Sequence, residues 1–190
     1  MESVVVITVP DAGEGREMLR ELHELDTHEG FDLGAAALVE RAGDGRVSLL
    51  DAEENPALGA TAAGTTIGLL LGALTGPIGL LVGGATGAAV GSLVDVADDE
   101  DSWTVVRSVS RAVPPGRAAV VAVVAESTPD GLDGVATRVD ATLWRRPRAD
   151  VERELAAAEQ AVIAAQRDAA RRRSIGDRLA DVKEALTGKR

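Results

Sequence analysis

Two histidines on one expected helix are the first residues whose types and spacing could do chemistry. His23 and His28 flank a short segment that superficially matches the His-Glu-x-x-His pattern of zinc peptidases. That pattern needs histidines four residues apart, so that both reach the metal from one helix face. Here the spacing is five residues, which rotates the second histidine by about 140° around the helix. We therefore expect surface histidines and no metal site.

The other residues that could do chemistry also have simpler explanations. Gly13 and Gly15 follow an expected strand, as in dinucleotide-binding loops, but Met18 stands where the third glycine belongs, and we expect a plain loop. The acidic run 95–101 lacks the alternating pattern of a calcium loop and suits the start of the helix expected after it. The chain has no cysteine and no Gly-x-Ser-x-Gly motif. We expect a protein that is not an enzyme and that has no cofactor.

The charge is strongly negative and unevenly distributed. The 190 residues include 20 Lys and Arg against 31 Asp and Glu, a net charge of −11. Residues 1–140 carry 8 basic and 23 acidic side chains, whereas residues 141–190 carry 12 basic and 8 acidic ones. An acidic body argues against nucleic acid as a partner, because phosphates need a basic face. The basic tail fits a solvated helix, a helix docked on the body or on a second subunit, or binding to anionic lipid.

Apolar runs and turn signals predict the elements that position these residues. Strands are expected at 4–9, 31–40, 46–51, 118–125 and 141–145. Capping residues, glycines and prolines predict helices at 11–28, 102–113 and 128–139. The run at 118–125 is apolar throughout, which favours the centre of the sheet. The resulting order, β-α-β-β-α-β-α-β, predicts an α+β ferredoxin-like sandwich with one extra unit.

The most informative feature is a run of 40 residues, 55–94, without a single charged side chain. Glycines recur every four residues on both sides of a turn at Pro77, and this spacing places each set along one helix stripe. An interior glycine costs a helix about 1 kcal/mol relative to alanine, which close packing of two helix backbones can offset. The pattern predicts an antiparallel glycine-zipper hairpin. The residues expected to pack it are Gly64, Gly68, Gly72, Gly76, Pro77, Gly79, Gly83, Gly87 and Gly91.

The outer faces of such a hairpin are apolar and must be covered. Each arm has about 20 residues, close to the length that spans a bilayer. However, the run is bounded by Glu54 and Asp95, whereas cytoplasmic flanks usually carry Lys and Arg. Two alternatives therefore stay open: insertion in membrane lipid, or burial in the core of a homo-oligomer. In a further alternative, a soluble homo-oligomer encloses an apolar cavity for a lipid-like ligand.

These features together resemble a bacterial family of predicted membrane proteins, "domain of unknown function twelve sixty-nine". The resemblance rests on the strand at 4–9, the hairpin at 31–51, the uncharged insert, the acidic exit at 98–101 and the strand at 118–125 followed by Thr128-Pro129. It covers about residues 1–145. It implies no activity, cofactor or catalytic residue. With it we expect a protein associated with the bacterial inner membrane, or a cytoplasmic one if the assembly is soluble; Met1 leads into an apolar strand without a signal-peptide pattern.

We therefore expect three parts: a ferredoxin-like domain formed by 1–54 and 95–146, a glycine-zipper helical hairpin at 55–94, and a helical tail at 147–190. In the tail, a helix is expected from Ala149 to Arg173, and a second helix is expected to start at Ser174. The first tail helix carries an apolar stripe formed by Val151, Leu155, Ala158, Val162 and Ala165. The expected function is non-enzymatic, as a membrane-associated or self-assembling protein.

Overall fold

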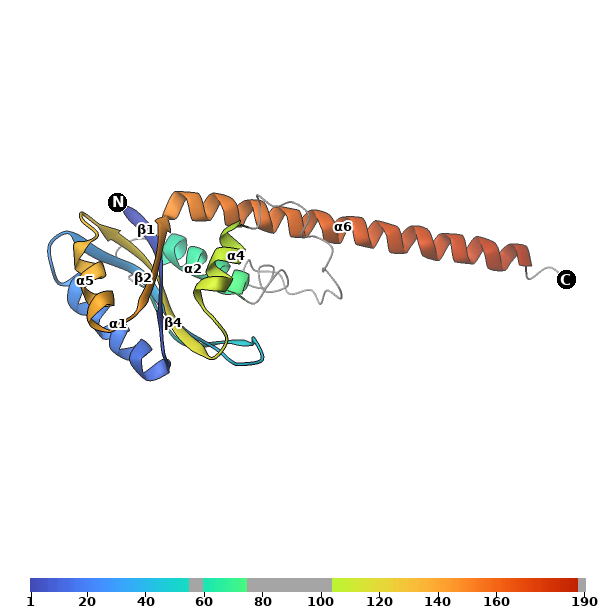
Figure 1. The fold of residues 1–190 in the computed structure, drawn as a ribbon. Coiled ribbons are helices and arrows are strands. Elements are labelled where there is room, and N and C mark those ends of the chain that lie inside the picture. Colours follow the sequence, from blue (N-terminus) through green and yellow to red (C-terminus); the bar gives the residue numbers. More distant parts are fainter. Residues whose placement is uncertain (55–59, 75–103, 188–190) are drawn as a thin grey trace.

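In a computed structural model the chain forms one antiparallel sheet with helices on both faces (Figure 1). The structure describes residues 1–54, 60–74 and 104–187. The strands are β1 (Glu2–Val9), β2 (Phe31–Arg41), β3 (Val47–Glu54), β4 (Arg117–Glu126) and β5 (Thr142–Pro147). The helices are α1 (Ala12–Asp26), α2 (Ala60–Leu74), α4 (Thr104–Ala112), α5 (Asp130–Arg138) and α6 (Arg148–Thr187).

The strand order is β3-β2-β4-β1-β5, and each neighbouring pair is antiparallel. Helix α1 connects β1 to β2, which lie on either side of β4. Helix α5 connects β4 to β5, which lie on either side of β1. β4 occupies the centre, as its continuous apolar sequence predicts, and β3 adds an edge strand beside β2. The predicted α+β class and the predicted order of these elements are confirmed.

Local side-chain chemistry explains how α1 begins. The Asp11 carboxylate accepts hydrogen bonds from the backbone N–H groups of Gly13 and Glu14, at 2.7 and 3.1 Å, which is a helix N-cap. The helix predicted to begin at Asp11 is confirmed, and the two glycines interpreted as a plain loop lie in its first turns. Gly15 packs closely on β2, so that a Cβ there would require the end of the Leu38 side chain to shift.

The turn between β2 and β3 follows its sequence signal. The N–H of Ala42 donates to the carbonyl of Arg46 at 2.8 Å, and the N–H of Gly45 donates to the carbonyl of Ala42 at 2.9 Å. Gly45 has a φ of 87°, a left-handed conformation that glycine adopts without strain. The hairpin predicted from the Gly and Asp residues is confirmed.

Side chains alternate between two buried clusters, one on each face of the sheet. Along β1, Val5 and Ile7 face the layer of α1 and α5, whereas Val4 and Val6 face the layer of α2, α4 and α6 (Figure 1). Strands covered on both faces need apolar residues at every position, which explains the continuous apolar runs of β1 and β4. The predicted strands at 4–9 and 118–125 thus owe their composition to two helix layers.

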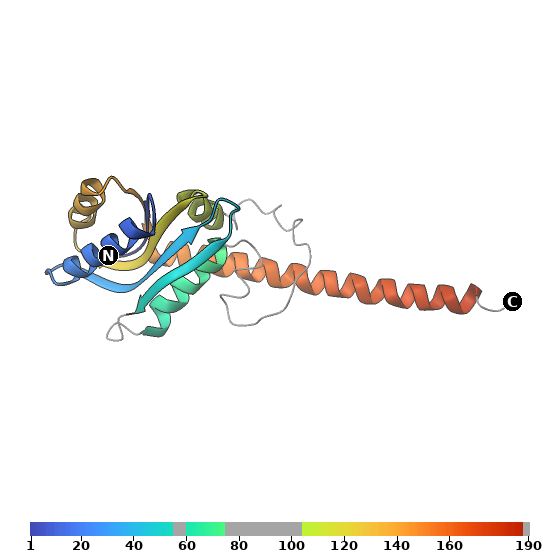
Figure 2. The same ribbon diagram turned by 90° about the horizontal axis from the view of Figure 1, so that it is seen from below.

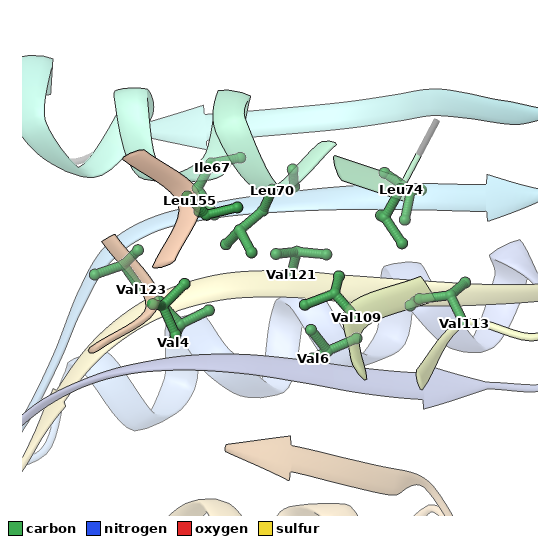
Figure 3. Packing of buried hydrophobic residues seen from close by; sticks show 14 of the residues in the cluster. Val4, Val6, Ile67, Leu70, Leu74, Val109, Val113, Val121, Val123 and Leu155 are labelled. Carbon is green, nitrogen blue, oxygen red and sulfur yellow. The ribbon is translucent and has the colours of Figure 1, made fainter. Parts of the chain in front are cut away.

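Helix α2, the first part of the uncharged run, packs within the second cluster. Ile67, Leu70 and Leu74 are 6%, 0% and 3% exposed and contact the sheet, α4 and α6 (Figure 3). Figure 2 shows α2 running alongside β2 and β3. From the sequence, lipid or other copies of the chain were expected to cover this surface. For the described part of the run the cover is the protein's own sheet.

Helix α6 is one continuous helix of 40 residues. The helix restart predicted at Ser174 is wrong, because serine is only mildly unfavourable in a helix interior and strong helix formers precede it. The predicted apolar stripe is confirmed at four of its five positions: Val151, Leu155, Ala158 and Val162 are buried against the sheet face, whereas Ala165 is half-buried. The C-terminal half of α6 extends away from the sheet (Figures 1 and 2).

The packing of α2 predicts a large stability loss for Leu70→Ala. Deleting most of a fully buried leucine side chain costs about 2–5 kcal/mol, from lost transfer energy and from the cavity left behind. The control is Arg16→Ala on the exposed face of α1, where the loss should stay below about 0.5 kcal/mol. Urea denaturation followed by circular dichroism measures both. Equal losses would show that α2 is not part of the core.

Candidate functional site

The site predicted from the sequence is the glycine stripe of the uncharged run, and the structure describes its first three residues. Gly64, Gly68 and Gly72 lie one turn apart in α2; Gly68 is half-buried and Gly72 is buried. The other predicted packing residues lie outside the described residues: Gly76, Pro77, Gly79, Gly83, Gly87 and Gly91. The helical arm before the turn is thus observed, while the paired hairpin and the domain boundaries stay predictions.

A polar contact fastens α2 to the start of α6. Thr66 is 1% exposed, and its hydroxyl donates to Oε1 of Glu152 at 2.6 Å. Nε of Arg148 donates to the same oxygen, also at 2.6 Å. Thr66 and Glu152 are 86 positions apart in the chain, and a threonine in an apolar run gives no sequence signal for a partner so distant in the sequence. The contact between Thr66 and Glu152 was therefore not predicted from the sequence.

This network changes the protonation of Glu152. Partial burial acts to raise the pKa of Glu152, but the hydrogen bonds from Thr66 and Arg148, together with the charge of Arg148, lower the pKa below its ordinary value. The carboxylate is therefore held in its charged form at the α2–α6 contact. Because its donors belong to both helices, the charged form favours the packed arrangement.

Two consecutive arginines of β5, Arg145 and Arg146, form ion pairs on opposite faces of the sheet. Nε of Arg145 lies 2.9 Å from Oε1 of Glu126, and its second nitrogen, Nη2, lies 2.8 Å from Asp133 of α5. Arg146 makes two hydrogen bonds, of 2.6 and 3.1 Å, to the carboxylate of Glu154 in α6. Alternation along the strand sends neighbouring side chains to opposite faces. The Arg-Arg pair therefore holds α5 on one face and α6 on the other.

Glu126 is the most buried of these carboxylates, with 6% of its side chain exposed. Burial raises the pKa of Glu126, the charge of Arg145 opposes the rise, and the charge of Asp133 adds to it. Its second oxygen, Oε2, is buried without a hydrogen-bond partner. We interpret this arrangement as structural. The Arg145–Glu126 ion pair lies at the end of β4, where the N-terminal amine also donates to the Glu126 carbonyl at 2.6 Å.

The two histidines do not converge on a common partner. Nδ1 of His23 lies 2.8 Å from the carbonyl of Leu19, and its Nε2 lies 2.6 Å from Glu53 of β3. Nδ1 of His28 lies 2.8 Å from the carbonyl of Glu24. Within the described ranges, no three His, Asp or Glu residues are grouped so that they could hold a metal ion. The acidic run at 95–101 lies outside those ranges.

An open cavity of about 750 Å³ lies at the β2–β3 hairpin, lined by Arg41, Ala42, Asp44, Gly45, Arg46, Val47 and Ser48. Its charged groups already have partners in the fold. Arg41 donates to the carbonyls of Ser110 and Val113, at 2.8 and 3.0 Å, and so satisfies the C-terminal end of α4. Arg46 pairs with Asp44 at 2.7 Å. This cavity is polar and differs from the apolar cavity expected for a lipid-like ligand.

The fold and the packing of α2 define a class of protein: an α+β domain that builds an uncharged helical segment into one face of its sheet. Residues 61–158, from α2 into α6, match the family described as "Protein of unknown function (DUF1269)", and the chain belongs to this family. No curated protein and no solved structure matches the chain. Among the described residues, no helix combines the length and apolarity needed to cross a membrane.

The α2–α6 contact predicts a pH-dependent effect of Thr66→Val, which removes the hydroxyl donor and keeps the side-chain shape. We expect the pKa of Glu152 to rise and the variant to lose about 1 kcal/mol of stability at pH 7. A lowered folded-state pKa stabilises the protein above the unfolded-state pKa, and this stabilisation is lost as the pH falls through the folded-state value. The loss should therefore shrink at about pH 3.

Denaturant unfolding at the two pH values measures this effect. The control is Thr137→Val, because the Thr137 hydroxyl is exposed and donates only within α5, to the Asp133 carbonyl. Equal losses for Thr66→Val at both pH values would contradict the proposed role of the Glu152 charge.

Proposed function

We propose that this protein acts without catalysis, as a self-assembling or membrane-associated protein in which a ferredoxin-like platform presents the uncharged segment 55–94. The segment pairs its glycine stripes in a helical hairpin, and its remaining apolar surface is covered by further copies of the chain or by membrane lipid. Nucleic acid is not a partner, because the body is acidic.

The strand order supports a ferredoxin-like platform. Without β3, the order is β2-β4-β1-β5, formed by two β-α-β units that each straddle a strand of the other unit. Helices α1 and α5 cover one face (Figure 1). β3, the uncharged segment and α4 then form an insertion between the two units. Two helices of this insertion, α2 and α4, pack on the face opposite α1 and α5.

The observation that carries the proposal is the anchoring of α2. It is a 15-residue helix without charge whose apolar side chains lie in the core of the domain, and residues 75–94 continue from it without a charge. Because α2 is packed in the core, it holds the rest of the uncharged segment at one place on the platform. Interior glycines that cost a helix stability need close backbone packing to offset them. Presentation of an apolar segment explains both features, whereas a flexible linker explains neither.

The packing of α2 helps to decide whether other copies of the chain or lipid cover the apolar surface of segment 55–94. Because Ile67, Leu70 and Leu74 are buried by the sheet and its helices, the first arm has less surface left for lipid. We therefore favour self-assembly, with lipid association as the alternative. An apolar cavity for a lipid-like ligand, enclosed by the hairpins of a soluble homo-oligomer, is a further alternative.

Gly83→Leu tests the proposal, because a leucine in the second stripe would force paired helices apart. For the wild type we expect a multimer in light scattering of the soluble fraction, or retention in carbonate-washed membranes. We expect Gly83→Leu to reduce that population at least twofold. Gly72→Leu is a poorer test, because Gly72 is buried in the described structure and a leucine there would disturb the body itself.

The matched control is Gly134→Leu, in helix α5, where a side chain would meet nothing within 4 Å. It should behave like the wild type. A wild-type protein that is monomeric and absent from washed membranes would refute the proposal, as would a Gly83→Leu protein that is indistinguishable from the control.

A further inference from the structure

Strand β3 forms a free edge of the sheet. In the part of the chain that the structure describes, β3 pairs with β2 on one side and with nothing on the other. Its leucines, Leu49 and Leu50, are 55% and 38% exposed; with Met1 they are the exposed large hydrophobic residues of the described ranges. A row of unpaired backbone groups beside exposed leucines is a template for a further strand.

A β-bulge at Leu50 sets which side chains share a face. Leu49 lies opposite Val39, and Asp51 lies opposite Leu38, so Leu50 is an extra residue in β3. The alternation therefore shifts at this point. Residues 46, 48, 51 and 53 share the face covered by α1, in agreement with the contact between Glu53 and His23 of α1. Residues 47, 49 and 52 share the other face.

The charges along β3 run in one direction. Arg46 precedes the strand, whereas Asp51, Glu53 and Glu54 occupy its end. Parallel pairing of two β3 strands would set acid against acid. Antiparallel pairing sets the basic start of one strand against the acidic end of the other, so β3 is complementary to itself in that direction.

We propose that β3 pairs with β3 of a second copy of this chain, antiparallel and about a two-fold axis between Leu49 and Leu50. In this register Arg46 lies opposite Glu53, Val47 opposite Ala52 and Ser48 opposite Asp51. In each pair the two residues lie on the same face of the sheet, as antiparallel pairing requires. They do so because the bulge at Leu50 shifts the alternation between the first and second halves of β3. The exposed leucines meet at the centre, and the two sheets become one.

The present partners of the two charged residues do not block this pairing. Arg46 pairs with Asp44, and Glu53 with His23, in side chains that are all 45% exposed or more. Such surface pairs contribute little and exchange readily. The β3 contact uses none of the predicted zipper glycines, so it goes beyond the proposed function and stands or falls separately from it.

Disulfide trapping tests the register, because the chain has no cysteine of its own. In the double variant Ser48→Cys/Asp51→Cys, each thiol lies opposite a thiol of the other copy. Because of the bulge, positions 48 and 51 of one strand lie opposite Glu40 and Leu38 and are about 7 Å apart, whereas opposite residues of two paired strands are about 4.5–5.5 Å apart and so form the disulfide more readily. A bond within one chain leaves the mobility of a monomer, so the gel separates the two products. After mild oxidation, more than half of the protein should run as a covalent dimer on a non-reducing gel. The controls Ser48→Cys alone and Ser48→Cys/Ala52→Cys should give less than a tenth.

A charge exchange tests the pairing without cross-linking. Arg46→Glu should weaken the dimer, seen by light scattering, by at least fivefold in Kd, and Arg46→Glu/Glu53→Arg should restore it. The cross-link should persist in the Gly83→Leu background, which separates this contact from the zipper. Cross-linking at control levels in the double variant would overturn the proposal, as would an equal yield from Ser48→Cys/Ala52→Cys or no rescue by the charge exchange.

Discussion

Strands β1 and β4 bury side chains on both faces of the sheet, and the rest of the structure depends on covering these two apolar surfaces. Helices α1 and α5 cover one surface. Among the described elements, those that cover the second come from distant parts of the chain: α2, α4 and the first half of α6. Leu70 from α2 and Leu155 from α6 thus meet above the same strands (Figure 3). A segment without charge is useful here, because a buried charge without a partner is costly.

The elements could be predicted from the sequence because their signals are local. A fully apolar strand such as 118–125 indicates the centre of a sheet, and the turn at Gly45 follows from its Gly and Asp neighbours. What covers an apolar helix is not a local property. The periodicity of α2 shows that Ile67 and Leu70 must be buried, but not whether lipid, another copy or the protein's own sheet buries them. Lipid and other copies were the expected covers, whereas the described arm is buried by the protein's own sheet.

The polar contacts escaped prediction for the same reason. Thr66 meets Glu152 only because α2 and α6 lie side by side, and Arg145 meets Glu126 only because β4 and β5 both end near the start of β1, which lies between them. By contrast, the start of α1 was predicted from a local signal, the capping carboxylate of Asp11, and the helix includes Gly13 and Gly15. For the candidate site, the glycines of α2 were assigned correctly to a helix, while their pairing with the second stripe stays a prediction. The family match supports the assignment of the chain without adding an activity.

The central claim is that α2 is part of the domain core and anchors the uncharged segment. Native-state hydrogen exchange tests it most directly, because amides in a core helix open only with the sheet beneath them. We predict that the backbone amides of residues 67–74 exchange as slowly as those of β4, at a rate that follows global unfolding. Exchange of these amides within seconds at neutral pH, while β4 stays protected, would show that α2 is not held by the sheet and would contradict the account.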